Sequence, residues 1–292
     1  MARSETAQRV LVAAVGAPLA AGAVYLGGWV LAALLALVAV LGTLELYRLA
    51  AAKGLRPLPA LGAGAAALWL LLAAFEPTAG PATPALAALL TTLVLAALVA
   101  VIWTHGVEGQ PLLGLAVTVI GVLYTAGLLA YGLFLRHLPG VESRAHGTAL
   151  VFAPVLLTWA NDTFAYFVGR RFGRHKLIPR VSPGKTVEGA AGALVGTVAV
   201  ALGYAFALRA FESYRLGPGQ AVLFGLLVAL AAQVGDLAES LLKRDAGVKD
   251  SGRLLPGHGG ALDRVDSLLF TLPLAYFFFR YLVGAAAPGA LG

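Results

Sequence analysis

Long, uninterrupted apolar segments restrict the fold of this chain more than any other feature of its sequence. Nine stretches of roughly 18 to 25 residues consist mainly of Ala, Leu, Val and Gly, and a helix of that length crosses the hydrocarbon core of a bilayer. Only α-helices and closed barrels satisfy all backbone hydrogen bonds inside lipid. The apolar runs are continuous and do not alternate with period two, so the sequence predicts helices.

We therefore predict an all-α, polytopic integral membrane protein, a helical bundle of about nine transmembrane helices. Hydrophobic residues make up 60% of the chain and its mean hydropathy is +0.86, more apolar surface than one globular core buries. The helices are expected at residues 9–26, 29–49, 58–75, 85–104, 112–136, 147–170, 187–210, 219–242 and 262–283.

Basic residues are distributed unequally between the two sides of this arrangement. If the N-terminus is cytoplasmic, 16 of the 21 Lys and Arg residues lie on the cytoplasmic side. The opposite side keeps Arg136, Arg144, Arg209, Arg215 and Arg280. Cytoplasmic loops attract such an excess, so we predict the N-terminus inside and the C-terminus outside, in a bacterial inner membrane. The same bias explains the net charge of +7, and we expect no nucleic-acid partner.

The charged residues divide the chain into two parts. Residues 1–150 have few polar groups within their apolar stretches and are expected to form a transmembrane scaffold. Glu45 is the exception there, and its place near a helix end predicts a side chain that reaches toward the membrane surface. Residues 151–292 are expected to form the catalytic region, with cytoplasmic loops at 171–186 and 243–261. The absence of cysteine excludes disulfides and thiolate metal sites.

The first polar segment within the apolar stretches is WANDTFAYFVGRRFGRHKLIP (159–179). Its Asn161 and Asp162 lie about two to three turns before a basic end, where an ionised side chain costs several kcal/mol without a partner. A structural ion pair with a neighbouring helix would satisfy Asp162, and so would water or a metal ion. The arginines that follow form a positive cytoplasmic rim suited to phosphates.

The second segment is RVSPGKTVEGA (180–190). Ser182 and Pro183 predict the start of a helix, with Ser182 as its cap. Backbone N–H groups at such a start, with Lys185 beside them, favour an anion, although an ordinary capped loop has the same sequence. The segment is not a Walker A loop, because Pro179 replaces the required glycine and no strand is expected before it.

Two further segments carry paired acidic residues. Asp236 and Glu239 share one helix face in QVGDLAESLLKRD (233–245). In PGHGGALDRVDS (256–267), Asp263 and Asp266 stand three apart at the start of the last apolar stretch. Helix capping explains one of these two, but Asp266 is expected inside the helix and close to hydrocarbon.

The acidic residues of these segments predict a metal site near one membrane face. They come from three apolar stretches, and basic loops flank all of them. Oxygen ligands without cysteine or clustered histidine favour a hard cation such as Mg²⁺, held inside a ring of Lys and Arg. Phosphate transfer requires that arrangement. The expected metal ligands are Asp162, Asp236, Asp263 and Asp266.

The segment GDLAESLLKRDAGVKDSGRLLPGHGGALDRVDS (235–267) closely resembles the signature of the phosphatidate cytidylyltransferases, also called CDP-diglyceride synthases. NDTFAYFVGRRFGRH (161–175) and SPGKTVEG (182–189) resemble the same family. The resemblance implies the reaction of CTP with phosphatidate to give CDP-diacylglycerol and pyrophosphate at the bilayer surface, with one or two Mg²⁺ ions. It also suggests a homodimer.

With this resemblance, each candidate residue receives a hypothetical role. Asp236, Asp263 and Asp266 hold Mg²⁺ as catalytic residues, and Asp162 supports the metal or orients a ligand. His258 donates to the leaving pyrophosphate or contacts the nucleotide, and Lys243 acts with it on the phosphates. Substrate binding is assigned to Asn161, Ser182, Lys185, Thr186, Arg244, Lys249 and Arg264.

Two alternatives stay open from the residues alone. An ion-coupled membrane transporter would use Asp162 and Asp236 as its intramembrane ion site. A nucleotidyltransferase acting on another lipid phosphate, such as a polyprenyl phosphate, would use the same charged loops.

Overall fold

The computed structural model describes the backbone of residues 2–252 and 259–284, and the side chains of residues 14–252 and 259–284. The chain forms two compact units, each assembled from two segments of the sequence. The first unit comprises residues 1–134 and 242–265, and the second comprises residues 135–241 and 266–292. The scaffold and catalytic regions predicted from the sequence meet at residue 150, so their boundary differs from that of the two compact units. In the structure, residues 242–265 belong with the N-terminal helices.

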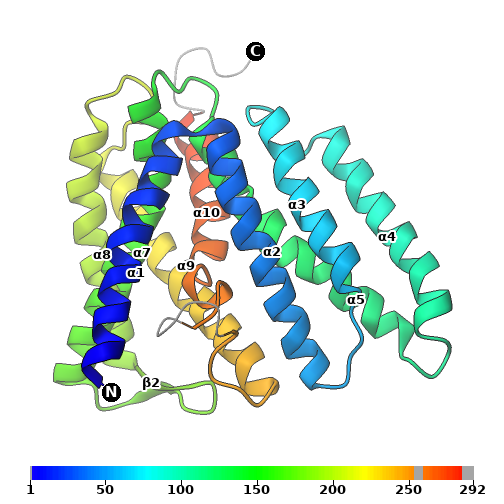
Figure 1. Cartoon of the computed structure of the whole chain (residues 1–292). Coiled ribbons are helices and arrows are strands. Elements are labelled where there is room, and N and C mark those ends of the chain that lie inside the picture. Colours follow the sequence, from blue (N-terminus) through cyan, green and yellow to red (C-terminus); the bar gives the residue numbers. More distant parts are fainter. Residues whose placement is uncertain (1, 253–258, 285–292) are drawn as a thin grey trace. The chain divides into compact units, whose positions relative to one another are not determined.

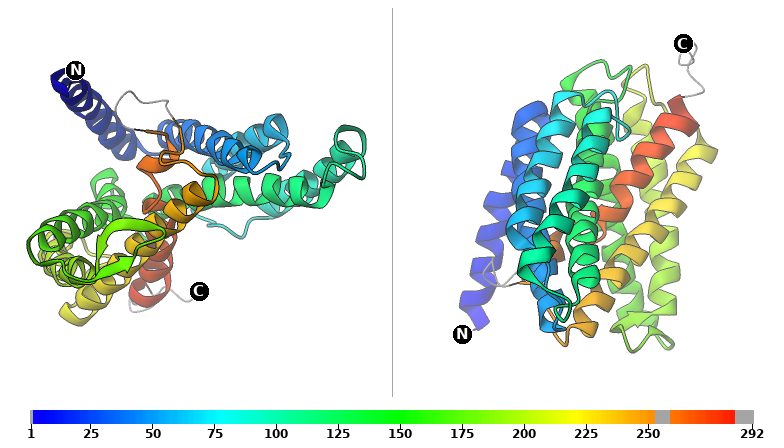
Figure 2. Two further views of the ribbon diagram at one scale, coloured as in Figure 1. Left: turned by 90° about the horizontal axis from the view of Figure 1, so that it is seen from below. Right: turned by 90° about the vertical axis from the view of Figure 1, so that its right-hand side faces the viewer.

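The first unit is a set of helices that follow one another along the chain (Figure 1). The right-hand view of Figure 2 shows α2 to α4 side by side, and α5 packs on α2, α3 and α4. Tyr47 of α2 lies against Gly62 and Gly121, and its hydroxyl donates to the Thr118 carbonyl at 2.6 Å. The helices of this unit are α1 (Ala2–Leu26), α2 (Gly28–Ala52), α3 (Pro59–Phe75), α4 (Pro84–Thr104), α5 (Pro111–Val122), a π-helical turn (Leu123–Gly127) and the start of α6 (Tyr131–Arg136), whose last two residues belong to the second unit.

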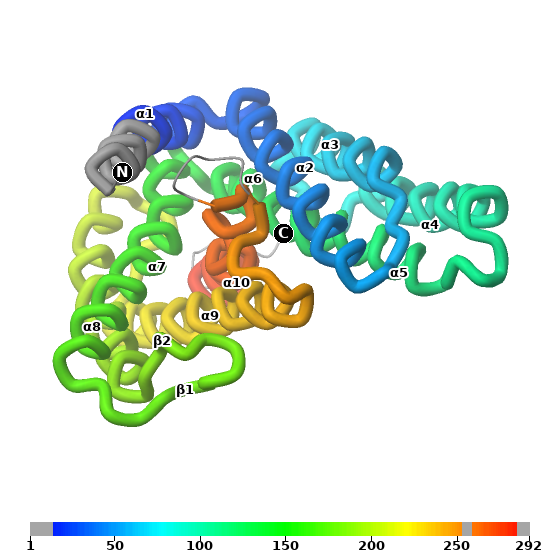
Figure 3. The backbone as a smooth tube through the Cα atoms, turned by 60° about the horizontal axis from the view of Figure 1, so that its bottom comes forward, coloured from blue at the N-terminus to red at the C-terminus, as the bar shows by residue number. Residues whose placement is uncertain are grey.

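The second unit combines long helices with a short β-hairpin (Figure 3). Its elements are α7 (Arg144–Phe172), β1 (Lys176–Ile178), β2 (Ser182–Thr186), α8 (Val187–Leu208), α9 (Pro218–Asp245), α10 (Leu268–Phe277) and a final π-helical turn (Phe278–Val283). The last four residues of α9, 242–245, belong to the first unit. The antiparallel strands pair Lys176 with Thr186 and Ile178 with Ser182. A 3-10 turn, Leu262–Arg264, precedes α10 and belongs to the first unit.

Glycines allow α7 and α8 to approach closely within the second unit. A Cβ added to Gly192 would lie 2.6 Å from the Val168 side chain, and one added to Gly189 would lie 2.7 Å from the Ala165 carbonyl oxygen. Small residues at such spacing let helix backbones meet. This contact lies within the chain, and it fixes the N-terminus of α8 beside the C-terminal half of α7.

Each of the nine predicted apolar stretches forms one helix or a series of consecutive helical segments. Six described helices are long and apolar enough to cross a membrane, and Ala14–Leu26, Pro59–Phe75 and Leu268–Val283 are shorter apolar helices. Prolines at the first position of α3, α4, α5 and α9 explain where these helices begin. The polytopic helical fold is confirmed, whereas nine crossings with the N-terminus inside stay predictions.

Three local expectations were wrong. Ser182 and Pro183 begin a strand, because the segment pairs with β1, and α8 starts only after Thr186, whose side chain accepts a hydrogen bond from the Gly189 N–H at 3.1 Å. Asp266 lies in the turn before α10, where its carboxylate accepts from the Ser267 N–H at 2.6 Å. The segment predicted as a loop from residue 243 begins later, since α9 runs to Asp245.

Candidate active site

A polar cavity of about 630 Å³ lies within the second unit. The end of α7, the β-hairpin, the start of α8 and the C-terminal half of α9 form its walls. Six residues selected from the sequence line it together, although they come from three separate segments of the chain. They are Asn161, Asp162, Ser182, Lys185, Thr186 and Asp236.

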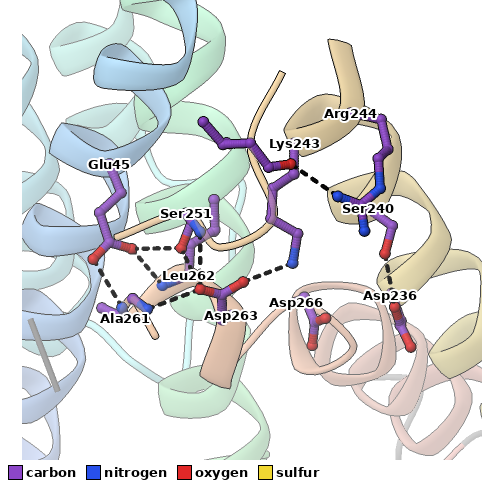
Figure 4. A network of polar contacts seen from close by, with 12 residues as sticks. Glu45, Asp236, Ser240, Lys243, Arg244, Ser251, Ala261, Leu262, Asp263 and Asp266 are labelled. Carbon is purple, nitrogen blue, oxygen red and sulfur yellow. Dashed lines mark hydrogen bonds and ion pairs between the residues drawn. The ribbon is translucent and has the colours of Figure 1, made fainter. Parts of the chain in front are cut away.

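Asp236 of α9 carries the central negative charge of this cavity. The Lys185 ammonium group forms an ion pair with its Oδ2 at 2.7 Å, and the Ser240 hydroxyl donates to its Oδ1 at 3.1 Å, a contact drawn in Figure 4. Both members of the ion pair are partly exposed to the cavity. A bound anion can therefore compete with Asp236 for the lysine.

Asn161 and Asp162 form a second polar group on the wall made by α7. The Asn161 Nδ2 donates to Asp162 Oδ1 at 3.2 Å, and the Gln233 Nε2 donates to Asn161 Oδ1 at 3.3 Å. Gln233 also donates to the Ala190 carbonyl at 3.4 Å, so it links α7, α8 and α9. Gln233 was not among the site residues predicted from the sequence. Its position could have indicated a role, because Gln233 is a polar residue one turn before Asp236 in an otherwise apolar helix.

The β-hairpin and the end of α7 bring further cationic groups to the cavity. Lys176 of β1 lines the cavity and donates to the Pro183 carbonyl at 2.7 Å. Arg170 of α7 donates to the Tyr166 hydroxyl at 2.8 Å and also lines the cavity. With Lys185, three cations therefore surround one polar space. Such a set attracts a polyanion.

Glu188 in the first turn of α8 holds the hairpin in place. Its carboxylate accepts from the backbone N–H groups of Arg174 and His175, at 3.0 and 3.2 Å. The His175 ring lies 2.6 Å from the same carboxylate. These contacts tie the chain before β1 to the start of α8, which keeps Lys185 and Thr186 at the cavity wall.

The first unit contains another charged cluster, centred on Asp263 (Figure 4). Lys243, in the last turn of α9, donates to Asp263 Oδ1 at 2.6 Å. The N–H groups of Ser251 and Gly260 donate to Oδ2 at 2.9 and 2.8 Å. Burial raises the pKa of Asp263, but the Lys243 and Gly260 hydrogen bonds outweigh it and lower the pKa to about 2. Asp263 is therefore a carboxylate with a fixed position.

The remaining predicted residues lie in different environments. Arg244 is exposed and donates to the Val248 carbonyl at 3.0 Å, and Lys249 and Arg264 are exposed in the same unit. Asp266 belongs to the second unit, where its turn packs on α9: a Cβ added to Gly235 would lie 2.8 Å from the Asp266 carbonyl oxygen. His258 lies outside the described residues.

The four predicted metal ligands belong to both units: Asp263 to the first, and Asp162, Asp236 and Asp266 to the second. Among the side chains of residues 14–252 and 259–284, no three His, Asp or Glu groups lie closely enough together to hold a metal ion. Mg²⁺ usually binds one or two carboxylates and completes its shell with water and substrate phosphates. Asp162 and Asp236, which both line the polar cavity, fit that donor set.

Comparison with known proteins identifies the relatives of this chain. A model described as the cytidylyltransferase family matches residues 7–282. The phosphatidate cytidylyltransferase of Synechocystis sp. is 36% identical over 295 residues, which cover 93% of this chain and 95% of that protein. The proteins of the same name from Staphylococcus saprophyticus and Thermotoga maritima are 44% and 43% identical over 133 and 142 residues. These alignments cover 46% and 48% of this chain, and 50% and 53% of the relatives. The match over nearly the whole length shows that this chain belongs to the cytidylyltransferase family.

Proposed function

We propose that this integral membrane protein transfers the cytidylyl group of CTP to phosphatidate, which gives CDP-diacylglycerol and pyrophosphate for phospholipid biosynthesis. The polar cavity is the observation that carries this proposal, because it combines two carboxylates with three cations. A nucleoside triphosphate needs such a mixture, since cations bind its phosphates and carboxylates hold a divalent ion. The family and the names of the relatives agree with this substrate pair.

The reaction exchanges one phosphorus–oxygen bond for another. A phosphate oxygen of phosphatidate attacks the α-phosphorus of CTP and forms the new bond. The bond between the α-phosphorus and the oxygen that bridges to the β-phosphorus breaks, and pyrophosphate leaves with the electron pair. Phosphatidate is already an anion near neutral pH, so the attack requires no strong general base. Positioning and charge neutralisation then provide most of the rate enhancement.

The residues of the cavity have matching roles. When a triphosphate binds, the ion pair between Lys185 and Asp236 breaks. The Lys185 ammonium group then forms an ion pair with a phosphate oxygen. Lys176 and Arg170 stabilise the other phosphates from neighbouring elements of the wall. The Thr186 oxygen accepts from the Gly189 N–H, so its proton is available to a phosphate. Ser182 offers a second hydroxyl from β2, and Asn161 orients Asp162.

We also propose that Mg²⁺, as one or two ions, is the cofactor. Asp162 and Asp236 would hold it together with phosphate oxygens of CTP, and it would neutralise charge on the reacting phosphates. The sequence adds Asp263 and Asp266 as ligands, and it assigns phosphate contacts to Lys243, Arg244, Lys249, Arg264 and His258. The inner membrane, the cytoplasmic location of the active site and the homodimer belong to the proposal as well.

One assay separates this proposal from the two alternatives. Purified full-length protein in lipid nanodiscs is incubated with α-labelled CTP and either phosphatidate or a polyprenyl phosphate, with diacylglycerol as the control that lacks a phosphate. We expect labelled CDP-diacylglycerol with phosphatidate alone. A labelled product with the polyprenyl phosphate alone would identify a different lipid substrate. No nucleotide-lipid with any acceptor would favour the transporter.

A further inference from the structure

Glu45 is a buried carboxyl group in an apolar helix. It lies in α2, which is long and apolar enough to cross a membrane, and only 2% of its surface is exposed. The expectation that this side chain reaches toward the membrane surface was therefore wrong. A carboxylate in such a position is costly unless hydrogen-bond donors surround it.

The donors come from the polypeptide that surrounds Asp263. Glu45 Oε1 accepts from the Ala261 N–H at 2.9 Å. Oε2 accepts from the Leu262 N–H at 2.8 Å and from the Ser251 hydroxyl at 3.0 Å. All four residues belong to the first unit, although the donors are more than 200 positions away in the sequence. Both oxygens of the carboxylate are thus occupied as acceptors (Figure 4).

Two glycines leave room for this contact. A Cβ added to Gly252 would overlap Glu45 Oε1, and one added to Gly260 would overlap Oε2. Any larger residue at either position would push the loop away from α2. Glu45 is thus the acceptor on α2, and the two glycines allow the loop to lie close to it.

The same loop residues also hold Asp263. The Ser251 hydroxyl lies 2.9 Å from Asp263 Oδ2, and the Ser251 and Gly260 N–H groups donate to that oxygen. Ser251 therefore connects the two carboxylates directly. The segment 260–262 connects them a second time, because Gly260 binds Asp263 while Ala261 and Leu262 bind Glu45.

We infer that Glu45 is a positioning residue: it anchors Ser251 and the 260–262 segment to α2 and so fixes the orientation of the Asp263 carboxylate. Its effect on rate rests on the proposed function, whereas the anchoring does not. Two acceptor oxygens and the length of the side chain are both required. Glutamine would turn an NH₂ group toward at least one of the backbone N–H groups of Ala261 and Leu262, and aspartate is one methylene too short to keep both oxygens in place.

The test compares full-length Glu45→Gln with a matched control on the same helix. Tyr47→Phe removes a buried hydrogen bond from α2 to the Thr118 carbonyl of α5. Hydrogen exchange reports the protection of amides 260–262, and steady-state assays give kcat and the KM for CTP. For Glu45→Gln we expect faster exchange at these amides and a fall in kcat of about ten- to a hundredfold, with KM changed less than about threefold. Tyr47→Phe should retain wild-type exchange at 260–262 and wild-type kcat.

Several results would overturn the inference. Wild-type exchange and kcat in Glu45→Gln would do so, and so would equal losses of kcat in Glu45→Gln and Tyr47→Phe. If Glu45→Gln does not fold, Ser251→Ala replaces it, and an unchanged kcat and exchange pattern there would contradict the anchoring. If the wild-type protein transfers no cytidylyl group, the proposed function fails, and the exchange data alone then decide whether Glu45 anchors the loop.

Discussion

The buried ion pair between Lys243 and Asp263 predicts a large, specific loss of stability on substitution. The two side chains are 11% and 7% exposed, and their charged atoms are 2.6 Å apart. At an effective dielectric constant of about 20, charges at that separation attract by roughly 6 kcal/mol, much of which offsets the cost of burying them. Removing one partner leaves the other charge buried, which typically costs about 3 to 5 kcal/mol.

Asp263→Asn is therefore expected to lower the free energy of unfolding by about 3 kcal/mol or more. Lys243→Met should have a similar effect, because it leaves the carboxylate without its cation. The double variant should lose less than the sum of the two, with a coupling of about 1 to 3 kcal/mol. Unfolding by SDS in mixed micelles measures all three variants. Losses below about 0.5 kcal/mol that simply add would refute the reasoning.

Three further predictions concern the polar cavity, the cofactor and pH. Lys185→Gln should raise the KM for CTP by about tenfold or more, the effect of one charge-assisted hydrogen bond, and an unchanged KM would remove Lys185 from the phosphate site. EDTA should abolish product formation and added Mg²⁺ should restore it, so turnover in excess EDTA would exclude the metal. The pKa of Asp263 is lowered to about 2 in the folded protein, below the value of about 3.9 expected when unfolded, so its stabilisation should persist above about pH 4 and disappear toward pH 2. Between about pH 4 and pH 2, the free energy of unfolding of Asp263→Asn should therefore depend less on pH than that of the wild type. An identical pH dependence in the wild type and in Asp263→Asn would contradict this prediction.

The helices and part of the candidate site could be predicted because each depends on local sequence. Apolar runs that begin at proline have few alternatives to a membrane helix. Asn161, Asp162, Lys185 and Asp236 were recognised as charged or polar groups within or beside such runs, and the structure places all four around one cavity.

The parts that could not be predicted depend on contacts between distant segments. Glu45 binds backbone N–H groups and one hydroxyl more than 200 residues away, and backbone donors leave no pattern in a sequence. The helix start predicted at Ser182 and Pro183 was wrong for a related reason, since α8 begins at Val187. Pro183 is a good first residue of a helix, but the pairing of β2 with β1 and the cap provided by Thr186 favour a later start.

Asp236 provides the most direct test of the account, because the polar cavity can serve cytidylyl transfer only if its central carboxylate takes part. Wild type, Asp236→Asn and Asp245→Asn, an exposed control on the same helix, are compared at saturating labelled CTP, phosphatidate and Mg²⁺ in nanodiscs. We expect Asp236→Asn to form CDP-diacylglycerol at least about a hundredfold more slowly than wild type, and Asp245→Asn to match wild type. A folded Asp236→Asn protein with wild-type turnover would contradict the assignment of this cavity as the active site.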